Sequence, residues 1–355
     1  MAGRRQPAKA KPSVYVDANG HIVYDLTQRE APPRRGAVSG RDFILEIPAD
    51  PPSLWGDGNR VAWAEGEGLM IYAPQGVGKT SLAQQLVNAR IGVGPPELLG
   101  LGVEPGKGKL LYLAMDRPPQ IARSWRRMVG AEDSEALAER VVVWQGPLPF
   151  KLTPDEPGKL VRWAIDELGI SDAVVIDSYK NLAPSLSDER TGAMIDSIAQ
   201  ETMVEGLGWV ALHHGRKANA DNKKPNTLDD VYGNVRLTAG MGSVLCLWGK
   251  PGDAQVELSH LKQPAEPVGP MLVLHDHATG RSTAVSVPPG SKPRDRAVVG
   301  VFVQRGGLGT TLTLKDLRHL GDDKYTREAL ARLVEDGVLR AEGHTTNKTW
   351  TLVRG

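Results

Sequence analysis

A glycine-rich turn between an apolar run and a helical pattern constrains the fold of this chain more than any other feature. The apolar run covers residues 69–72, and Gly76 and Gly78 follow it. Glycine lets backbone N–H groups face a ligand without a Cβ in the way. A helix that starts near Lys79 aims its free N–H groups and the positive end of its dipole at the same point. The stretch therefore predicts a strand, a phosphate-binding loop and a helix in succession.

Strand, glycine loop, Lys-Thr and helix form the context of a P-loop, which binds a nucleotide. Lys79 is placed to reach the β- and γ-phosphates of ATP, and the Thr80 hydroxyl is placed to ligate Mg²⁺. Ala73 stands where the first glycine usually sits, at the end of the strand. The alternative, a chance glycine-rich turn, does not account for the flanking strand and helix. The predicted nucleotide-binding residues are Pro74, Gln75, Gly76, Val77, Gly78, Lys79, Thr80 and Ser81.

Composition bounds the remaining possibilities. The chain has 355 residues, enough for roughly two domains plus tails, and 40% of them are hydrophobic. A net charge of +1 gives no global attraction to nucleic acid or membrane. The one cysteine, Cys246, lies in an apolar run and predicts a packing role in a reducing compartment. No apolar run approaches the ~20 residues of a membrane span, and no signal peptide is recognisable, so we expect a soluble, cytoplasmic protein.

Apolar strands alternate with helical patterns after the glycine loop. We expect strands at 109–116, 141–144, 173–178 and 209–214, and amphipathic helices at 121–129 and 160–168. This alternation predicts an α/β fold with a mostly parallel sheet and helices on both faces. Prolines and glycines predict an irregular segment at 41–68 and a long loop at 92–108.

Two strands end in a carboxylate. Asp177 ends an apolar strand downstream of the P-loop, which is the Walker B pattern for a Mg²⁺ ligand; the alternative is an Asp that caps the next turn. Ser178 stands where many oligomeric ATPases carry a catalytic Glu, so a water-activating base must come from elsewhere. Asp116 ends a strand that we expect to neighbour the P-loop strand, which would place it near the γ-phosphate.

On these pieces the chain, over about residues 41–287, resembles the RecA-like hexameric helicases of the plasmid RepA and DnaB type. That family usually carries Glu, often followed by Asp, where this chain has Met115-Asp116. The resemblance implies that Asp116 is the catalytic base. It also implies a polar γ-phosphate sensor at the end of the strand 209–214, for which His213 and His214 are alternatives because adjacent strand residues point to opposite faces.

The resemblance further implies a site completed by a neighbouring subunit. Lys262 matches the lysine that the family inserts in trans, while Pro264 replaces the usual arginine two positions later. An arginine finger must then come from elsewhere, with Arg236 as a candidate. Such a site implies a homo-oligomer, most simply a hexameric ring. His275 and His277 lie on a late strand without evident partners, and we expect them at the surface.

Two polar loops follow the Walker B and sensor strands, at 182–191 and 215–234. The second carries Arg216, Lys217, Lys223 and Lys224. In RecA-like rings such loops face the central channel, so the resemblance implies contact with single-stranded DNA; a merely solvated loop is the alternative. Residues 1–40 predict a basic flexible tail that holds a hairpin around residues 18–20.

The C-terminal part predicts a second domain. Residues 288–293 form a linker rich in proline and glycine, and 294–355 predict a winged helix with helices at 297–303, from 313, and at 326–337. Its third helix would offer Lys324, Arg327 and Arg332 to DNA, although many winged helices bind protein instead.

Together these features predict an ATP- and Mg²⁺-dependent nucleic-acid motor, most simply a RepA-like hexameric DNA helicase that replicates a phage, plasmid or mobile element, with a replication initiator as a possible partner. Two alternatives stay open: a RecA-type recombination mediator that forms filaments, and a nucleotide-switched DNA-binding regulator with little hydrolysis.

Overall fold

The computed structural model describes residues 37–45, 47–48, 50–183, 185–215, 223–286, 288, 290–307, 309–344 and 347–353, and the backbone of two N-terminal strands. These strands, β1 (Val14–Val16) and β2 (Ile22–Tyr24), pair antiparallel, which confirms the strands of the predicted hairpin. Most of the predicted basic tail lies outside the described residues, as do Arg216 and Lys217.

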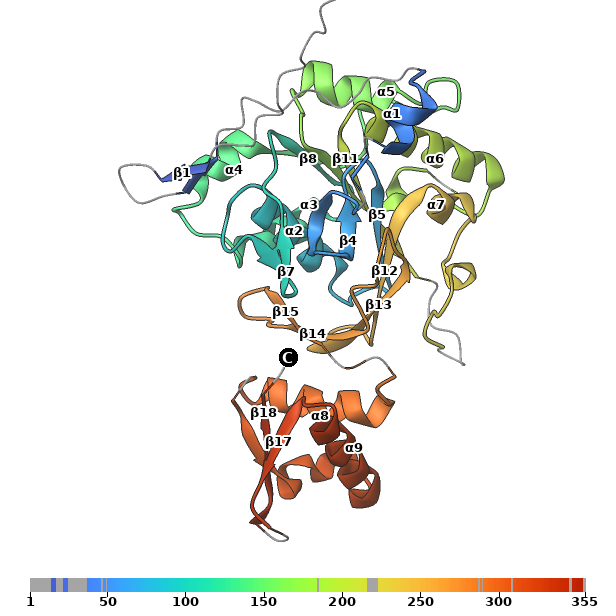
Figure 1. The fold of residues 1–355 in the computed structure, drawn as a ribbon. Coiled ribbons are helices and arrows are strands. Elements are labelled where there is room, and N and C mark those ends of the chain that lie inside the picture. Colours follow the sequence, from blue (N-terminus) through green and yellow to red (C-terminus); the bar gives the residue numbers. More distant parts are fainter. Residues whose placement is uncertain are drawn as a thin grey trace, which may run out of the picture.

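A nine-stranded sheet forms the centre of the larger unit, in the order β15-β14-β13-β12-β5-β11-β10-β8-β9 (Figure 1). The six strands from β12 to β9 are parallel, and the last three extend the sheet antiparallel. The predicted α/β class with a mostly parallel, RecA-like P-loop core is confirmed. The parallel strands are β5 (Gly68–Ala73), β8 (Leu110–Ala114), β9 (Val141–Gln145), β10 (Ala173–Asp177), β11 (Gly208–His214) and β12 (Met241–Trp248). The antiparallel strands are β13 (Gln255–Lys262), β14 (Met271–His275) and β15 (Ser282–Ser286).

Both faces of the sheet are covered, and the strand period of two explains why β5 is apolar throughout. Leu69 and Ile71 belong to a core with α2 (Lys79–Arg90) and α3 (Pro118–Arg126). Met70 and Tyr72 point to the other face and belong to a core with α5 (Lys159–Arg162) and α6 (Glu189–Val204). A π-helix, Trp163–Glu167, continues α5, so the helix expected at 160–168 is confirmed, and Gly169 follows its end with a φ of 68°.

The expected position of the strand before Asp116 is wrong. β8 pairs with β10 and β9, whereas β5 lies between β11 and β12. In chain order, β8 follows β5 in this sheet but lies three positions away from it. β10 and β11 then fill the positions between β8 and β5, and β12 pairs with the other side of β5. The neighbours of β5 are therefore strands that come much later in the chain, and the order of strands in the sequence does not predict this pairing.

Two segments expected to be irregular form a second, four-stranded sheet in the order β4-β3-β7-β6. Trp55 and Trp63 explain the difference, because both indoles are buried and donate hydrogen bonds, to Leu98 O at 2.9 Å and to Glu67 O at 2.8 Å. The strands are β3 (Ser53–Asp57), β4 (Arg60–Ala64), β6 (Glu97–Leu98) and β7 (Leu101–Val103). Short helices α1 (Gly40–Leu45), α4 (Ser134–Arg140) and α7 (Arg236–Ala239) also belong to the larger unit.

The C-terminal residues have their own apolar core and lie beside β14, whose Leu272 joins that core (Figure 1). Their elements follow in the order α8 (Pro293–Gln304), β16 (Thr311–Thr313), a 3₁₀ helix (Leu314–Leu320), α9 (Asp323–Glu335), β17 (Leu339–Glu342) and β18 (Thr349–Leu352). Arg332, expected to be offered to DNA, instead donates to the buried Asp295 at 2.6 Å.

A buried ion pair fixes the P-loop helix to the Walker B strand. Arg90 lies at the end of α2 and Asp172 precedes β10, and both side chains are 4% exposed and in contact. Arg90 Nη1 also donates to Glu104 O at 2.6 Å.

Removing one member of this pair should destabilise the protein. In Arg90→Leu the Asp172 carboxylate stays buried without its cation, which costs about 3–5 kcal/mol of unfolding free energy. Urea denaturation measures this loss. The double variant Arg90→Leu/Asp172→Leu removes both charges and should recover most of it; a double variant as unstable as Arg90→Leu would contradict this account.

Candidate nucleotide-binding site

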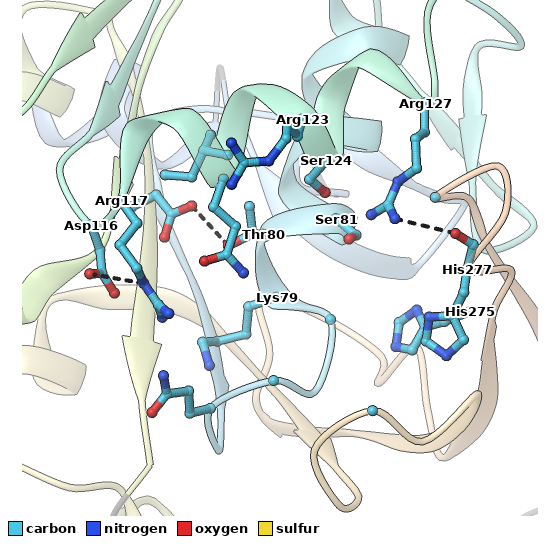
Figure 2. A pocket seen from close by; sticks show the side chains of 18 of the residues that line it. Lys79, Thr80, Ser81, Asp116, Arg117, Arg123, Ser124, Arg127, His275 and His277 are labelled. Atoms are coloured by element: carbon cyan, nitrogen blue, oxygen red, sulfur yellow. Dashed lines mark hydrogen bonds and ion pairs between the residues drawn. The ribbon is translucent and has the colours of Figure 1, made fainter.

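A pocket of about 1140 Å³ lies at the carboxyl ends of β5, β10 and β11, which is ample for a nucleoside triphosphate (Figure 2). The P-loop and the start of α2 form one wall, and α3 forms the wall opposite. The turn between β14 and β15 closes one end. The lining includes Gln75, Gly76, Gly78, Lys79, Thr80, Ser81, Asp116, Asp177 and His214 among the predicted residues; Pro74 and Val77 belong to the loop but do not line the pocket.

The loop takes its shape from two glycines in the left-handed region. Gly76 has a φ of 77° and Gly78 a φ of 96°. A Cβ on Gly78 would lie 2.4 Å from the His275 ring, so a side chain there is excluded by sterics as well as by backbone conformation. The helix α2 begins directly after Gly78, which directs its unpaired N–H groups into the pocket.

Lys79 is buried and held by the loop itself. Its Nζ donates to Ala73 O and Pro74 O, both at 2.8 Å. Burial lowers the pKa of Lys79 to about 8, although the charge of Asp177 opposes the shift. The ammonium is therefore desolvated at the first residue of α2, and an anion in the pocket would stabilise it.

Asp177 is the carboxylate on which two hydroxyls converge. Its Oδ2 accepts from Thr80 Oγ1 and from Tyr112 OH, both at 2.9 Å. Burial raises the pKa of Asp177, and these two hydrogen bonds and the charge of Lys79 lower it in part. The 2.9 Å between the Thr80 and Asp177 oxygens is about the edge of an octahedron whose ligands lie ~2.1 Å from Mg²⁺. Thr80 and Asp177 therefore fit as the protein side of a magnesium site.

A network that sequence reasoning missed supports this carboxylate. Tyr112 on β8 packs against Trp125 of α3, with ring centroids 5.0 Å apart. Trp125 Nε1 donates to Asn88 Oδ1 of α2 at 2.7 Å. In the sequence, the one sign of these hydrogen bonds is that a Tyr and an Asn stand at positions where the apolar pattern predicts burial.

Asp116 lines the pocket even though β8 does not neighbour β5. Its backbone N–H donates to Asp177 O, so the chain stays beside the end of the Walker B strand after β8 has ended. Lys180 Nζ donates to Asp116 Oδ2 at 2.6 Å, and Arg117 Nε lies 3.6 Å from Oδ1. Burial alone would raise the pKa of Asp116, but Lys180 first and Arg117 second outweigh it, so the pKa is lowered. The carboxylate is ionised and aimed at the pocket.

The two histidines of β11 point in opposite directions, as expected. His214 lines the pocket, and burial followed by the charges of Lys79 and Lys180 lowers its pKa to about 3. His213 is buried on the other face, where its Nε2 bonds to Tyr232 O and its ring lies 5.7 Å from that of Tyr72. Burial lowers the pKa of His213 to about 4. Of the two, His214 is placed to contact phosphate.

The expectation that His275 lies at the surface without partners is wrong. His275 Nε2 donates to Val77 O at 3.1 Å, and its Nδ1 bonds to Ser282 Oγ at 2.8 Å. The ring lines the pocket beside Gly78. His277 lies beyond the end of β14 in an exposed turn, where its carbonyl accepts from Arg127 at 3.3 Å (Figure 2). A single histidine on a strand about 200 positions away gives no local signal of this contact.

Lys262 lies near the amino-terminal ends of the parallel strands, whereas the pocket lies at their carboxyl ends. It pairs with Val244, which pairs with Met70 near the start of β5. Its Nζ donates to Ala239 O at 2.7 Å, at the end of α7 (Arg236–Ala239). Lys262 therefore does not contact the phosphate site of its own chain. Arg236 lies on the same helix, 3.6 Å from Glu189.

The second polar loop is only partly described, and part of its charge is neutralised. Lys223 is exposed, whereas Lys224 forms an ion pair with Glu257, which also binds Arg296 of α8. Within the described ranges, no group of three or more His, Cys, Asp or Glu could hold a metal ion. No helix in the same ranges is long and apolar enough to cross a membrane.

Comparison with known proteins agrees with this geometry. A family model described as an AAA domain matches residues 31–220, more than half of the chain, so the chain belongs to this AAA domain family of P-loop ATPases. Among solved structures, the ATPase domain of G40P is similar with a TM-score of 0.45 and 13% identity, over 63% of this chain and 86% of that chain. No curated protein sequence matches the chain.

Removing the His275 ring should loosen the P-loop. His275→Ala deletes the hydrogen bond to Val77 O, worth about 0.5–1.5 kcal/mol, so amide exchange across residues 75–79 should accelerate about 2- to 13-fold. Hydrogen–deuterium exchange with mass spectrometry measures it. His277→Ala is the matched control and should leave the rate unchanged; equal rates in both variants would refute the anchoring role.

The pKa of Lys79 predicts how nucleotide affinity depends on pH. A phosphate needs the protonated ammonium, which is present below pH 8 and lost as the pH rises through the pKa of about 8. Affinity for Mg·ADP should be constant below pH 8 and fall about tenfold per unit above it. Titration of a fluorescent nucleotide between pH 6.5 and 9.5 tests this. Lys79→Arg stays charged and should show no such fall; a pH-independent wild type would contradict the prediction.

Proposed function

We propose that this protein is an ATP-dependent nucleic-acid motor, most simply a RepA-like hexameric DNA helicase. The observation that supports it most is the convergence of Lys79, Thr80, Asp177, Asp116 and His214 on one pocket. A phosphate-binding loop, a pair of magnesium ligands and an ionised carboxylate suit phosphoryl transfer to water, and a neutral imidazole beside them can contact the γ-phosphate.

Each residue has a separate role in this proposal. The backbone of residues 74–81 binds the phosphates, and Lys79 exchanges its two carbonyl partners for β- and γ-phosphate oxygens. Thr80 and Asp177 hold Mg²⁺, which neutralises phosphate charge when bound. Asp116 accepts the proton of the attacking water, and His214 reports the γ-phosphate to β11 and the loop beyond it.

The proposed ring rests on the position of Lys262. This lysine lies away from the pocket of its own chain, so any contact with a nucleotide would have to be made in another copy. We propose that it contributes charge in trans to a neighbour, which makes the homo-oligomer the active form. The first polar loop ends at residue 188 and not at 191 as expected, because α6 begins at Glu189. This loop and the one at 215–234 follow β10 and β11 and would contact single-stranded DNA, with the exposed Lys223 as one phosphate ligand.

We further propose that residues 294–355 form a winged helix and 288–293 its linker. The order helix, strand, helix, helix, strand, strand and the separate apolar core support this. With Arg332 bound to Asp295, a DNA contact through α9 would rely on Lys324 and Arg327.

Turnover with and without single-stranded DNA tests the proposal. We expect a DNA-stimulated ATPase whose kcat falls at least about 100-fold in Lys79→Ala and in Asp116→Ala, because the first loses phosphate charge and the second loses the base. A coupled phosphate-release assay measures the rate.

Lys159→Ala, an exposed lysine on α5 away from the pocket, is the control and should behave as wild type. Full turnover in Asp116→Ala would overturn the base assignment. Duplex binding without stimulation by single strands would favour the nucleotide-switched regulator.

A further inference from the structure

Arg117 has a backbone conformation that its side chain does not favour. It directly follows Asp116 and precedes α3, with φ 55° and ψ 63°, in the left-handed region. Besides glycines, only Leu99 shares a positive φ in the part of the chain that the structure describes. Residues held in such conformations persist where the surrounding structure fixes them, and they concentrate at functional sites.

This conformation directs the Arg117 side chain into the pocket. Figure 2 shows its guanidinium reaching from the start of α3 toward Lys79, with the ion pair to Asp116 on one side. Three further arginines line the α3 wall, but Arg127 binds His277 O at the far end. Among the arginines that line the pocket, Arg117 is the one that pairs with Asp116.

We propose that Arg117 supplies, from the same chain, the cation that stabilises the γ-phosphoryl group during hydrolysis, which rests on the proposed ATPase function of this pocket. A cation close to the γ-phosphoryl group stabilises the negative charge that develops there during transfer. Lys262 and Arg236 do not line the pocket of their own chain, so a cation from the same chain must be another residue. Arg117 is already beside Asp116, the carboxylate proposed as the base.

The ion pairs of Asp116 with Arg117 and Lys180 suggest how hydrolysis of ATP would proceed in this pocket. A γ-phosphate oxygen competes with Asp116 for Arg117, while Lys180 keeps the carboxylate in place. Water then attacks the γ-phosphorus and gives its proton to Asp116, and the bond from phosphorus to the β,γ-bridging oxygen breaks. ADP leaves with that electron pair, inorganic phosphate forms, and Asp116 releases the proton to solvent. Arg117 offsets the charge that develops on the transferring group.

Two substitutions separate the side chain from the backbone. Arg117→Gly removes the guanidinium and accepts the left-handed conformation without cost, and Arg117→Lys keeps a charge. For Arg117→Gly we expect kcat to fall at least about 100-fold, with Arg117→Lys between it and wild type. Arg162→Ala, an exposed arginine on α5, should match wild type.

Ligand affinities show whether Arg117 acts on the transition state. Arg117→Gly should bind Mg·ADP within about threefold of wild type but lose about 100-fold in affinity for Mg·ADP with tetrafluoroaluminate. A fall in kcat smaller than about tenfold overturns the proposal, as does an equal loss of affinity for both ligands.

Mixing variants distinguishes action in cis from action in trans. Lys79→Ala subunits carry an intact Arg117, so mixed with Arg117→Gly they would restore turnover if Arg117 served a neighbour. We expect no restoration at any ratio, and restored turnover would overturn the proposal. A wild type that neither binds nor hydrolyses Mg·ATP would instead refute the proposed function itself, whatever the variants do.

Discussion

The Asp177 carboxylate, bound by hydroxyls from two other elements, is the contact on which the rest of the pocket depends. Thr80 brings the P-loop helix to it, and Tyr112 brings β8, so three elements meet at one buried charge. A buried carboxylate is costly unless it is hydrogen-bonded or bound to a cation. The hydroxyls and Lys79 supply part of that compensation, and a metal with phosphate would supply the rest. The fold therefore keeps a charge in place whose full stabilisation requires a ligand.

The antiparallel extension of the sheet shapes the P-loop from the other side. His275 on β14 binds Val77 O and fills the space beside Gly78, and Gly252, in the turn after β12, donates its N–H to Gly76 O. The same extension carries Glu257, which binds Lys224 of the second polar loop and Arg296 of α8. One pair of strands thus contacts the phosphate loop, a proposed DNA loop and the C-terminal residues.

Local sequence patterns predicted many of the strands, helices and site residues. The features that they did not predict depend on pairing between distant parts of the chain. The P-loop, the strand that ends in Asp177 and the opposite directions of His213 and His214 follow from spacing over a few residues. The order of the strands does not, because β11 and β12 flank β5 from positions more than 130 residues later. His275 and Tyr112 were missed for the same reason. The hairpin at 53–64 was missed because its prolines and glycines outweighed two tryptophans that bury completely.

The most direct test of the central claim is calorimetric titration of the full chain with a non-hydrolysable ATP analogue in Mg²⁺. The account predicts saturable binding at one site per chain, lost in Lys79→Ala and weakened when Mg²⁺ is chelated, because Thr80 and Asp177 then hold no metal. Saturation that is unaffected by chelation and by the loss of Lys79, or no binding heat at any concentration or temperature tried, would contradict it.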